Sequence, residues 1–230
     1  MVADVLAKRE DQSPLLISEL PKDTREAFLY CAGLSFLRRG GWYLAGGTAL
    51  ALQVGHRQSV DLDFFTPQPK FRETALERSL LETKKWTTSF RETGTLYGVL
   101  QKAKASFIAY PFFQPAHPWV HYGTLRILTP PDIAAMKIIA ISQRGRKRDF
   151  VDLYWYCRHR ESLFTVVQCA ARQYPGQEEN TNHILRSLMY FADAEADPMP
   201  RLFFTVTWGQ IKRYFQTEVP RITREFLGLR

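Results

Sequence analysis

The chain has 230 residues, of which 45% are apolar and 23% are charged, so it is long enough to bury a sizeable core in one large domain or two small ones. It contains no uncharged apolar run of about 18 residues, and Met1 to Glu10 carry mixed charge, so we expect neither a transmembrane helix nor a signal peptide. Its three cysteines form no disulfide or zinc pattern, which favours a cytoplasmic protein. The net charge of +8 favours polyanionic partners.

The first half of the chain combines helical and strand patterns. Residues 22–39 show a mostly helical apolar spacing that ends at Gly40-Gly41. We then expect a strand at 42–45, a short helix at 48–54, a strand at 60–65, a helix at 71–83, and strands at 87–91, 95–100, 105–110 and 125–128, with a loop at 111–123. The short gaps between the three middle strands favour antiparallel pairing.

The second half is expected to be helical. Thr129-Pro-Pro-Asp132 is a helix start signal, with threonine as the cap and proline in the first position. Helices are expected up to residue 143 and at 149–158, 163–173, 182–191 and 208–227, with a basic loop at 144–148 and a connecting loop at 193–200. Because strands precede residue 128 and helices follow it, the fold class is predicted to be α+β, with a mixed, largely antiparallel sheet flanked by helices.

Two aspartates lie one residue apart in an apolar segment. In a strand, Asp61 and Asp63 point to one face together with Ser59, while Val60, Leu62 and Phe64 point to the other. Two neighbouring carboxylates repel each other, and a divalent cation relieves that repulsion. The segment therefore predicts a site for one or two Mg²⁺ ions.

A glycine turn precedes this metal motif. Gly46 and Gly47 stand between a strand and a short helix, where backbone N–H groups can face a phosphate. The Thr48 hydroxyl is a candidate for a further hydrogen bond to that phosphate. Arg57 is expected either to touch a phosphate or to neutralise a carboxylate. Ser59 either binds a phosphate, accepts a phosphoryl group or simply fills a strand position.

Charged residues in the second half complete the candidate site. Lys137 interrupts an otherwise apolar helix and needs a partner, for which a triphosphate, Asp61, Asp63 or a later carboxylate would serve. Asp149 and Asp152 lie three apart on the next helix. Asp152 is the candidate for pairing with Lys137 or for orienting the acceptor, whereas Asp149 is suited to capping the helix. The five histidines show no metal pattern: His56, His117, His121, His159 and His183.

Four segments carry a family resemblance: Leu44-Ala-Gly-Gly-Thr-Ala-Leu, the Gly55 to Phe65 block, Ala135-Met-Lys-Ile-Ile-Ala140 and Arg148-Asp-Phe-Val-Asp-Leu-Tyr154. Together they resemble the AbiEii/AbiGii-type nucleotidyltransferase toxins, which are minimal members of the DNA polymerase β-like superfamily. The resemblance implies Mg²⁺ at Asp61 and Asp63 and nucleotide phosphates held by Gly46, Gly47 and Lys137. It also implies a catalytic core at 1–128 completed by a helical region at 129–230, with a C-terminal carboxylate matched by Asp152 or Asp149.

The same resemblance implies the reaction and the partners. Members act beside a cognate antitoxin and move a nucleotide from an NTP onto an RNA acceptor such as tRNA. A small-molecule or protein acceptor, or a catalytically idle nucleotide- or RNA-binding module, is the alternative. Many relatives in the superfamily carry a third carboxylate on a later strand, but Lys104 to Tyr110 has no acid. Either Asp152 supplies the base, or metal and water do.

Overall fold

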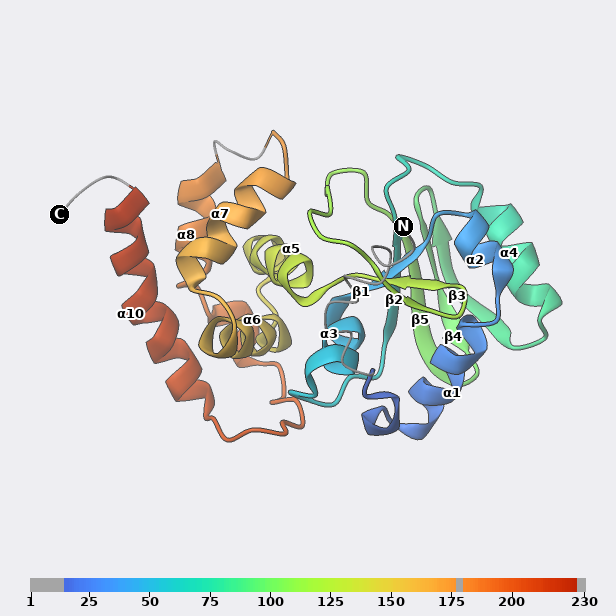
Figure 1. The fold of residues 1–230 in the computed structure, drawn as a ribbon, viewed down its shortest axis with the longest axis horizontal. Helices are drawn as coiled ribbons and strands as arrows, with labels where there is room; N and C mark the ends of the chain where they lie inside the picture. The colour runs from blue at the N-terminus through green and yellow to red at the C-terminus, as the bar shows by residue number, and fades with distance from the viewer. Residues whose placement is uncertain (1–14, 177–179, 227–230) are drawn as a thin grey trace, which may run out of the picture.

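The computed structural model describes residues 15–176 and 180–226, and within them seven strands form one mixed sheet (Figure 1). The strand order is β3-β4-β5-β2-β1-β7-β6. The strands are β1 (Tyr43–Ala45), β2 (Leu62–Thr66), β3 (Trp86–Glu92), β4 (Thr95–Leu100), β5 (Ala103–Ala109), β6 (Val120–Tyr122) and β7 (Leu125–Ile127). Among these described strands, β1–β7 and β2–β5 pair in parallel and the other neighbours antiparallel, which confirms the predicted sheet type.

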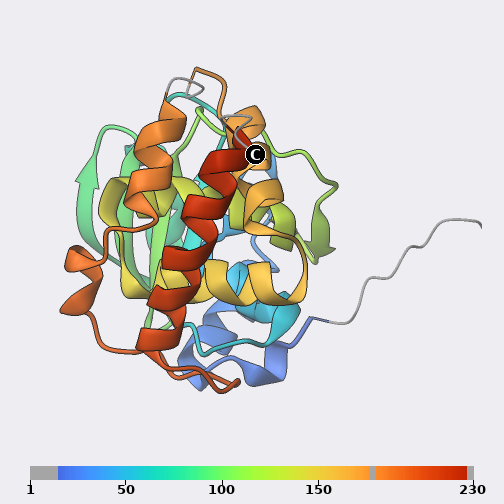
Figure 2. The same cartoon turned by 90° about the vertical axis from the view of Figure 1, so that its left-hand side faces the viewer.

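The helices separate into two groups around the sheet. Figure 1 shows α1, α2 and α4 beside the sheet, α5 to α8 and α10 gathered at the opposite end, and α3 between the groups. Figure 2 shows α10 lying across the outside of the helical end. The helices are α1 (Lys22–Cys31), α2 (Ser35–Arg39), α3 (Gly46–Val54), α4 (Glu73–Glu82), α5 (Pro130–Arg144), α6 (Lys147–His159), α7 (Leu163–Gln173), α8 (Thr181–Ser187), α9 (Ala192–Glu195) and α10 (Trp208–Phe226), preceded by a 3-10 turn, η1 (Ile17–Glu19). The α+β class is therefore confirmed.

One apolar core connects both halves of the molecule. It contains Phe64 and Phe107 of the sheet and Phe150 and Phe215 of the helical end, all fully buried. Phe64 and Phe107 stack with ring centroids 5.0 Å apart, and Phe150 meets Phe215 edge to face. The boundary between 1–128 and 129–230 stays a prediction, because packing joins the two regions in a single core.

The single helix expected at 22–39 is wrong, because a turn divides it into α1 and α2. Thr124, in the β6–β7 hairpin, donates from its backbone N to Ala32 O at 2.8 Å and from its hydroxyl to Cys31 O and Leu34 O, each at 3.2 Å. These carbonyls would otherwise accept helical N–H groups. A contact with a segment about 90 residues later therefore ends α1.

Four smaller expectations also differ from the structure. The loop at 111–123 contains strand β6, which is too short to show an alternating pattern and exists by pairing with β7. The loop at 193–200 contains the short helix α9, and the helix expected at 182–191 ends at Ser187. Strand β2 begins at Leu62, so Val60 lies outside it and is 51% exposed instead of facing the core.

Candidate active site

A cavity lies where the glycine turn, the aspartate segment and helices α5 and α6 meet. Most of the polar residues predicted for the site line it: Gly46, Gly47, Arg57, Ser59, Asp61, Asp63 and Lys137. Thr48, Asp149 and Asp152 do not line it. Phe65, Ile108, Tyr110, Ile133 and Met136 supply an apolar wall, so the cavity offers charged groups for phosphates and an apolar surface for a flat ring.

The glycine turn at Gly46 and Gly47 lets the backbone approach the Asp63 carboxylate and the Arg57 guanidinium closely. Helix α3 begins at Gly46, whose φ is +72°, and a Cβ there would lie 2.8 Å from Asp63 Oδ2. A Cβ at Gly47 would overlap the Arg57 guanidinium and lie 3.1 Å from Ser59 Oγ. Glycine at both positions therefore keeps the helix N-terminus, with its free N–H groups, open to the cavity.

Asp61 and Asp63 face the cavity together, as strand alternation predicts, while Leu62 and Phe64 are fully buried behind them. Ser106 of the parallel neighbour β5 lies opposite Asp63 and donates from Oγ to Asp63 Oδ1 at 2.7 Å. Arg148 Nη1 lies 3.0 Å from Asp61 Oδ2. Burial raises the pKa of Asp63 above its ordinary value, and the nearby charge of Asp61 adds to that rise although Ser106 opposes it.

Thr48 holds the segment of residues 59–61, which leads into the aspartate pair, in place by hydrogen bonds. Its side chain is fully buried, its hydroxyl is 2.9 Å from Ser59 Oγ, and it donates to the backbone carbonyl of Asp61. These contacts tie the first turn of α3 to residues 59–61. Thr48 does not line the cavity, and these contacts give it a positioning role for the aspartate segment.

A buried ionic cluster holds Lys137 and Arg57 at the cavity wall. Lys137 Nζ lies 2.6 Å from Asp149 Oδ1 and 2.7 Å from Asp152 Oδ2. Arg57 donates from Nε and Nη2 to the two oxygens of Asp152 at 2.6 and 2.9 Å, and His56 Nε2 lies 2.7 Å from Asp152 Oδ1. All five residues are buried, and each cation has a carboxylate partner, as buried charges require.

The cluster determines the charge of its members. Burial acts to raise the pKa of Asp152, but the charges of Arg57 and Lys137 and the hydrogen bond from His56 hold it well below its usual range. Burial lowers the pKa of His56 despite Asp152, so this ring is neutral. A carboxylate that is fully buried, weakly basic and outside the cavity lining is not placed to orient an acceptor or to take its proton. Asp152 pairs with Lys137, which confirms the other role expected for it, and it positions both Lys137 and Arg57.

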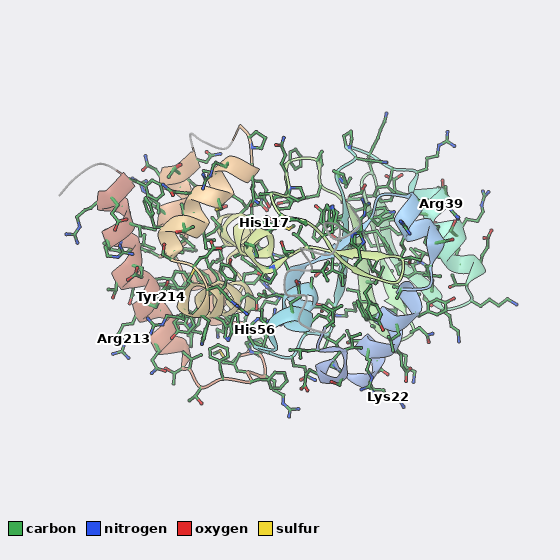
Figure 3. The ribbon with its side chains drawn as sticks, in the orientation of Figure 1. Lys22, Arg39, His56, His117, Arg213 and Tyr214 are labelled. Atoms are coloured by element: carbon green, nitrogen blue, oxygen red, sulfur yellow. The ribbon has the colours of Figure 1, made fainter. Side chains whose placement is uncertain are left out.

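Sequence patterns gave no indication of His56 or Ser106. His56 lies between α3 and α6 (Figure 3), and only its position directly before Arg57 hinted at a role. Ser106 occupies the strand beside Asp63, in the stretch where no acid was found. The β2–β5 register, which the chain order does not reveal, brings it to the site.

The expected basic loop at 144–148 is largely wrong. Helix α5 extends to Arg144 and α6 begins at Lys147, so Gly145 and Arg146 alone connect them. Lys147 is buried, donates from Nζ to the carbonyls of Glu195 and Asp197, and lies 5.2 Å from the Trp208 ring centroid. Its charge therefore fastens α6 to the C-terminal region, while Arg144 and Arg148 line the cavity.

The C-terminal region also secures the residues that precede the aspartates. Gln58 N donates to Arg201 O and Phe203 N donates to His56 O, both at 2.9 Å. Arg57 and Leu202 form an isolated antiparallel bridge between these bonds. Residues 201–203 thus fix the segment that delivers Arg57 and Ser59 to the cavity.

Comparison with known proteins identifies the class to which this fold and site belong. The family model described as "Nucleotidyl transferase AbiEii toxin, Type IV TA system" matches residues 28–114 and 111–226. The chain therefore belongs to the AbiEii family of nucleotidyltransferase toxins of type IV toxin–antitoxin systems, and it is a nucleotidyltransferase. This confirms the resemblance seen in the motifs.

Individual relatives are more distant. An uncharacterized protein of Aquifex aeolicus (strain VF5) is 31% identical over 204 residues, covering 87% of this chain and 96% of that protein. The nucleotidyltransferase toxin MenT4 of Mycobacterium tuberculosis H37Rv superposes with a TM-score of 0.48 at 16% identity, covering 87% and 84% of the two chains. The polyadenylate synthase of Megavirus superposes with a TM-score of 0.39 at 14% identity, covering 55% of this chain and 30% of that one.

The cavity carboxylates suit the divalent cation that the family implies. No group of three or more His, Cys, Asp or Glu side chains gathers as a metal cluster within residues 15–176 and 180–226. Asp61 and Asp63 share one cavity, and the missing side chain of Gly46 keeps Asp63 Oδ2 accessible. Mg²⁺ commonly binds one or two carboxylates and completes its coordination with water and substrate phosphates, which fits this pair. Separately, none of the helices in the described ranges has the length and apolar character of a membrane span.

Proposed function

We propose that this nucleotidyltransferase moves a nucleotide from an NTP onto an RNA acceptor, such as tRNA, as a toxin controlled by a cognate antitoxin. One observation carries the proposal: Asp61, Asp63, Lys137 and the N-terminus of α3 all line the same cavity. Mg²⁺ held by Asp61 and Asp63 would supply charge stabilisation for the α-phosphate and the leaving pyrophosphate. The protein itself binds and orients the two substrates.

Lys137 is prepared to bind a phosphate. An ammonium group has three donors, and those of Lys137 that face Asp149 and Asp152 are engaged. Its remaining N–H is available to the cavity that the residue lines. Because both carboxylates are fixed in the buried cluster, Lys137 holds its charge in place before the substrate arrives, which lowers the reorganisation needed for catalysis.

The free N–H groups of α3 provide the second phosphate contact. Gly46 and Gly47 allow an oxygen to approach them closely, and the helix N-terminus adds positive potential. On the opposite wall, Tyr110 and Phe65 offer aromatic surface on which a nucleobase can stack. The cavity therefore accommodates the two ends of an NTP separately.

RNA is favoured as the acceptor by charge. The net charge of +8 attracts polyanions, and Arg144 and Arg148 lie at the cavity on the exposed side of the α5–α6 junction. These two arginines are our candidates for contacts with acceptor phosphates. A small molecule or protein acceptor would not need them.

The test incubates the protein with each α-³²P-labelled NTP, Mg²⁺ and total RNA. Label should enter RNA with the wild type, and Asp61→Asn or Asp63→Asn should abolish transfer without unfolding the protein. Asp193→Asn is the matched control, because Asp193 is exposed and outside the cavity. Transfer near the wild-type rate by either cavity variant would refute the mechanism. Label in protein or a small molecule would refute the RNA acceptor, and NTP binding without pyrophosphate release would indicate an idle module.

Toxicity is tested separately. Expression of the wild type in a bacterial host should arrest growth, Asp61→Asn should not, and co-expression of the cognate antitoxin should restore growth. Equal arrest by the wild type and Asp61→Asn would separate toxicity from nucleotidyl transfer and contradict the proposal.

A further inference from the structure

Two shallow hollows outside the catalytic cavity meet at Val60 and Asp61. The lysine hollow lies between the start of α1 and the β4–β5 turn, and its charged residues are Lys22, Asp23, Asp61, Lys102 and Lys104. The arginine hollow lies between the α5–α6 junction and the C-terminal region, and its charged residues are Arg57, Asp61, Arg146, Arg148, Asp197 and Arg201. Asp61 also lines the catalytic cavity, so both hollows lead to the same carboxylate.

The lysine hollow has uncompensated positive charge. Lys22, Lys102 and Lys104 are exposed, and no ion pair engages their ammonium groups in the described parts of the chain. Asp23 and Asp61 are the carboxylates that face them. Lys22 lies on α1 at the edge of the molecule (Figure 3). This arrangement leaves the cations available to an external anion.

The arginine hollow is also cationic, although part of its charge is balanced. Arg146 pairs with Asp197 at 3.2 Å and Arg148 with Asp61 at 3.0 Å. Arg57 is neutralised by Asp152 in the buried cluster. The exposed guanidinium of Arg201 has no carboxylate partner within the described residues.

The β4–β5 turn of the lysine hollow has an unfavourable sequence for its geometry. Gln101 and Lys102 connect the strands with φ values of +59° and +93°. Asn-Gly or another glycine-containing pair is the usual choice for this left-handed turn, because a Cβ is disfavoured at positive φ. Residues held in strained conformations cluster at functional sites. The turn thus holds a lysine that lines the hollow at a position where glycine would be less strained.

Hydrogen bonds fix the backbone where the two hollows meet, and exposed apolar side chains lie beside Asp61 there. Thr24 Oγ1 donates to Val60 O at 3.1 Å from α1, and Gln58 N donates to Arg201 O at 2.9 Å on the other side. Val60 is 51% exposed and Met199 is 37% exposed. Cations therefore flank exposed apolar side chains on both sides, and a positively charged groove is the feature that tracks the backbone of a single-stranded nucleic acid.

We propose that the RNA acceptor lies over Val60 and Asp61, with phosphates bound by Lys22, Lys102 and Lys104 on one side and by Arg146 and Arg201 on the other. This inference rests on the proposed function and adds a second binding surface, on the side of Asp61 opposite the α5–α6 junction. An acidic protein segment, such as part of an antitoxin, is less well matched, because the surface surrounds the catalytic carboxylate that an acceptor must reach.

Binding can be measured without catalysis. Fluorescence anisotropy with a labelled single-stranded RNA, in EDTA and without NTP, would compare Lys102→Gln/Lys104→Gln with Lys84→Gln/Lys85→Gln. The control pair removes the same charge from exposed positions outside both hollows. Each lost phosphate contact should reduce the slope of log K against log salt by about 0.7. The hollow variant should therefore bind more weakly with a shallower slope, and the control should match the wild type.

Glycine substitution separates charge from folding. Lys102→Gly relieves a positive φ of 93°, and Lys84→Gly relieves one of 56° elsewhere, so neither should lower the melting temperature. Lys102→Gly should weaken RNA binding while Lys84→Gly should not. Equal RNA affinity for the two variants would overturn the inference, as would weakened binding of an antitoxin with unchanged RNA binding.

Transfer assays distinguish this inference from the proposed function. The lysine-hollow variants should raise the KM for RNA while the kcat and the KM for NTP stay unchanged. If wild-type protein labels RNA and these variants have an unchanged RNA KM, the binding surface is refuted and the reaction stands. If Asp61→Asn transfers normally, the reaction is refuted, and EDTA-independent RNA binding still tests the surface.

Discussion

Neutralising the buried carboxylate of Asp152 tests whether the ionic cluster of Arg57, Lys137, Asp149 and Asp152 stabilises the fold. Asp152→Asn preserves the shape of the side chain but removes its charge. Lys137 would keep Asp149 at 2.6 Å. Arg57, 4% exposed, would lose its negatively charged partner and one of its two side-chain acceptors, and would keep at most the amide oxygen and the carbonyl of Gln58 at 2.9 Å. The variant therefore leaves one buried guanidinium uncompensated.

The expected loss of stability follows from that orphaned charge. Removing one partner of a buried ion pair costs about 3–5 kcal/mol, because the other charge remains desolvated. With a urea m-value of about 2–3 kcal/mol/M, the midpoint of unfolding should fall by about 1–2 M. Glu218→Gln is the control, since it removes a partly exposed partner of the exposed Arg221, and such surface pairs contribute about 0–1 kcal/mol. A loss below about 1 kcal/mol for Asp152→Asn would refute the cluster as a source of stability.

The pH dependence checks the same reasoning with a defined sign. The folded pKa of Asp152 is well below the ordinary 3.8, so its contribution is present above the unfolded pKa and is lost as the pH falls toward the folded pKa. The stability difference between wild type and Asp152→Asn should be constant from neutral pH down to about pH 5 and shrink below about pH 4. A difference that grows on acidification would contradict the assignment.

A double-mutant cycle between Asp152 and Arg57 identifies which buried charge loses its partner in Asp152→Asn. If Arg57 causes most of the loss, Arg57→Met combined with Asp152→Asn should cost less than the sum of the single variants, by about 0.5–3 kcal/mol. Additive losses would show that the two residues act independently.

Three further predictions concern the cavity itself. Gly46→Ala should keep the fold but lower kcat strongly, because its Cβ would lie 2.8 Å from Asp63 Oδ2 at a φ of +72°; a kcat near the wild-type value would contradict the close approach. Thr48→Val removes the hydroxyl contacts to Ser59 and to the Asp61 carbonyl. It should lower the free energy of unfolding by about 1–3 kcal/mol, measured by urea titration, and it should reduce the rate of transfer in the labelling assay. Chelation by EDTA should abolish transfer and added Mg²⁺ should restore it, whereas transfer that persists in EDTA would exclude the metal site.

Local patterns were enough to predict the class of fold and most of the cavity wall. Alternation in the segment from Asp61 to Phe65 predicts that Asp61 and Asp63 share one face, and both line the cavity although β2 begins only at Leu62. The i,i+3 spacing of Asp149 and Asp152 puts both on the face of α6 that meets Lys137. These periodicities arise within a single strand or helix, so they can be predicted from the order of residues in the chain alone.

Tertiary structure decided the roles that depend on partners far along the chain. Asp152 changes from a candidate base to a positioning residue because Arg57 and His56, about 95 residues earlier, engage it in a dry interior. Ser106 reaches Asp63 through strand pairing, and Thr124 ends α1 from a distant hairpin.

The amino-acid sequence by itself therefore determined the family, the α+β class and the residues that carry charge into the site. The three-dimensional packing determined which of those charges remain free, because burial and neighbouring ions set the pKa and accessibility of each group. Lys137 lines the cavity while paired with Asp149 and Asp152, Lys147 is engaged by the C-terminal region, and Lys102 lines the hollow beside Asp61 without an ion-pair partner in the described residues. These three lysines thus differ in which groups pack against them in the folded protein.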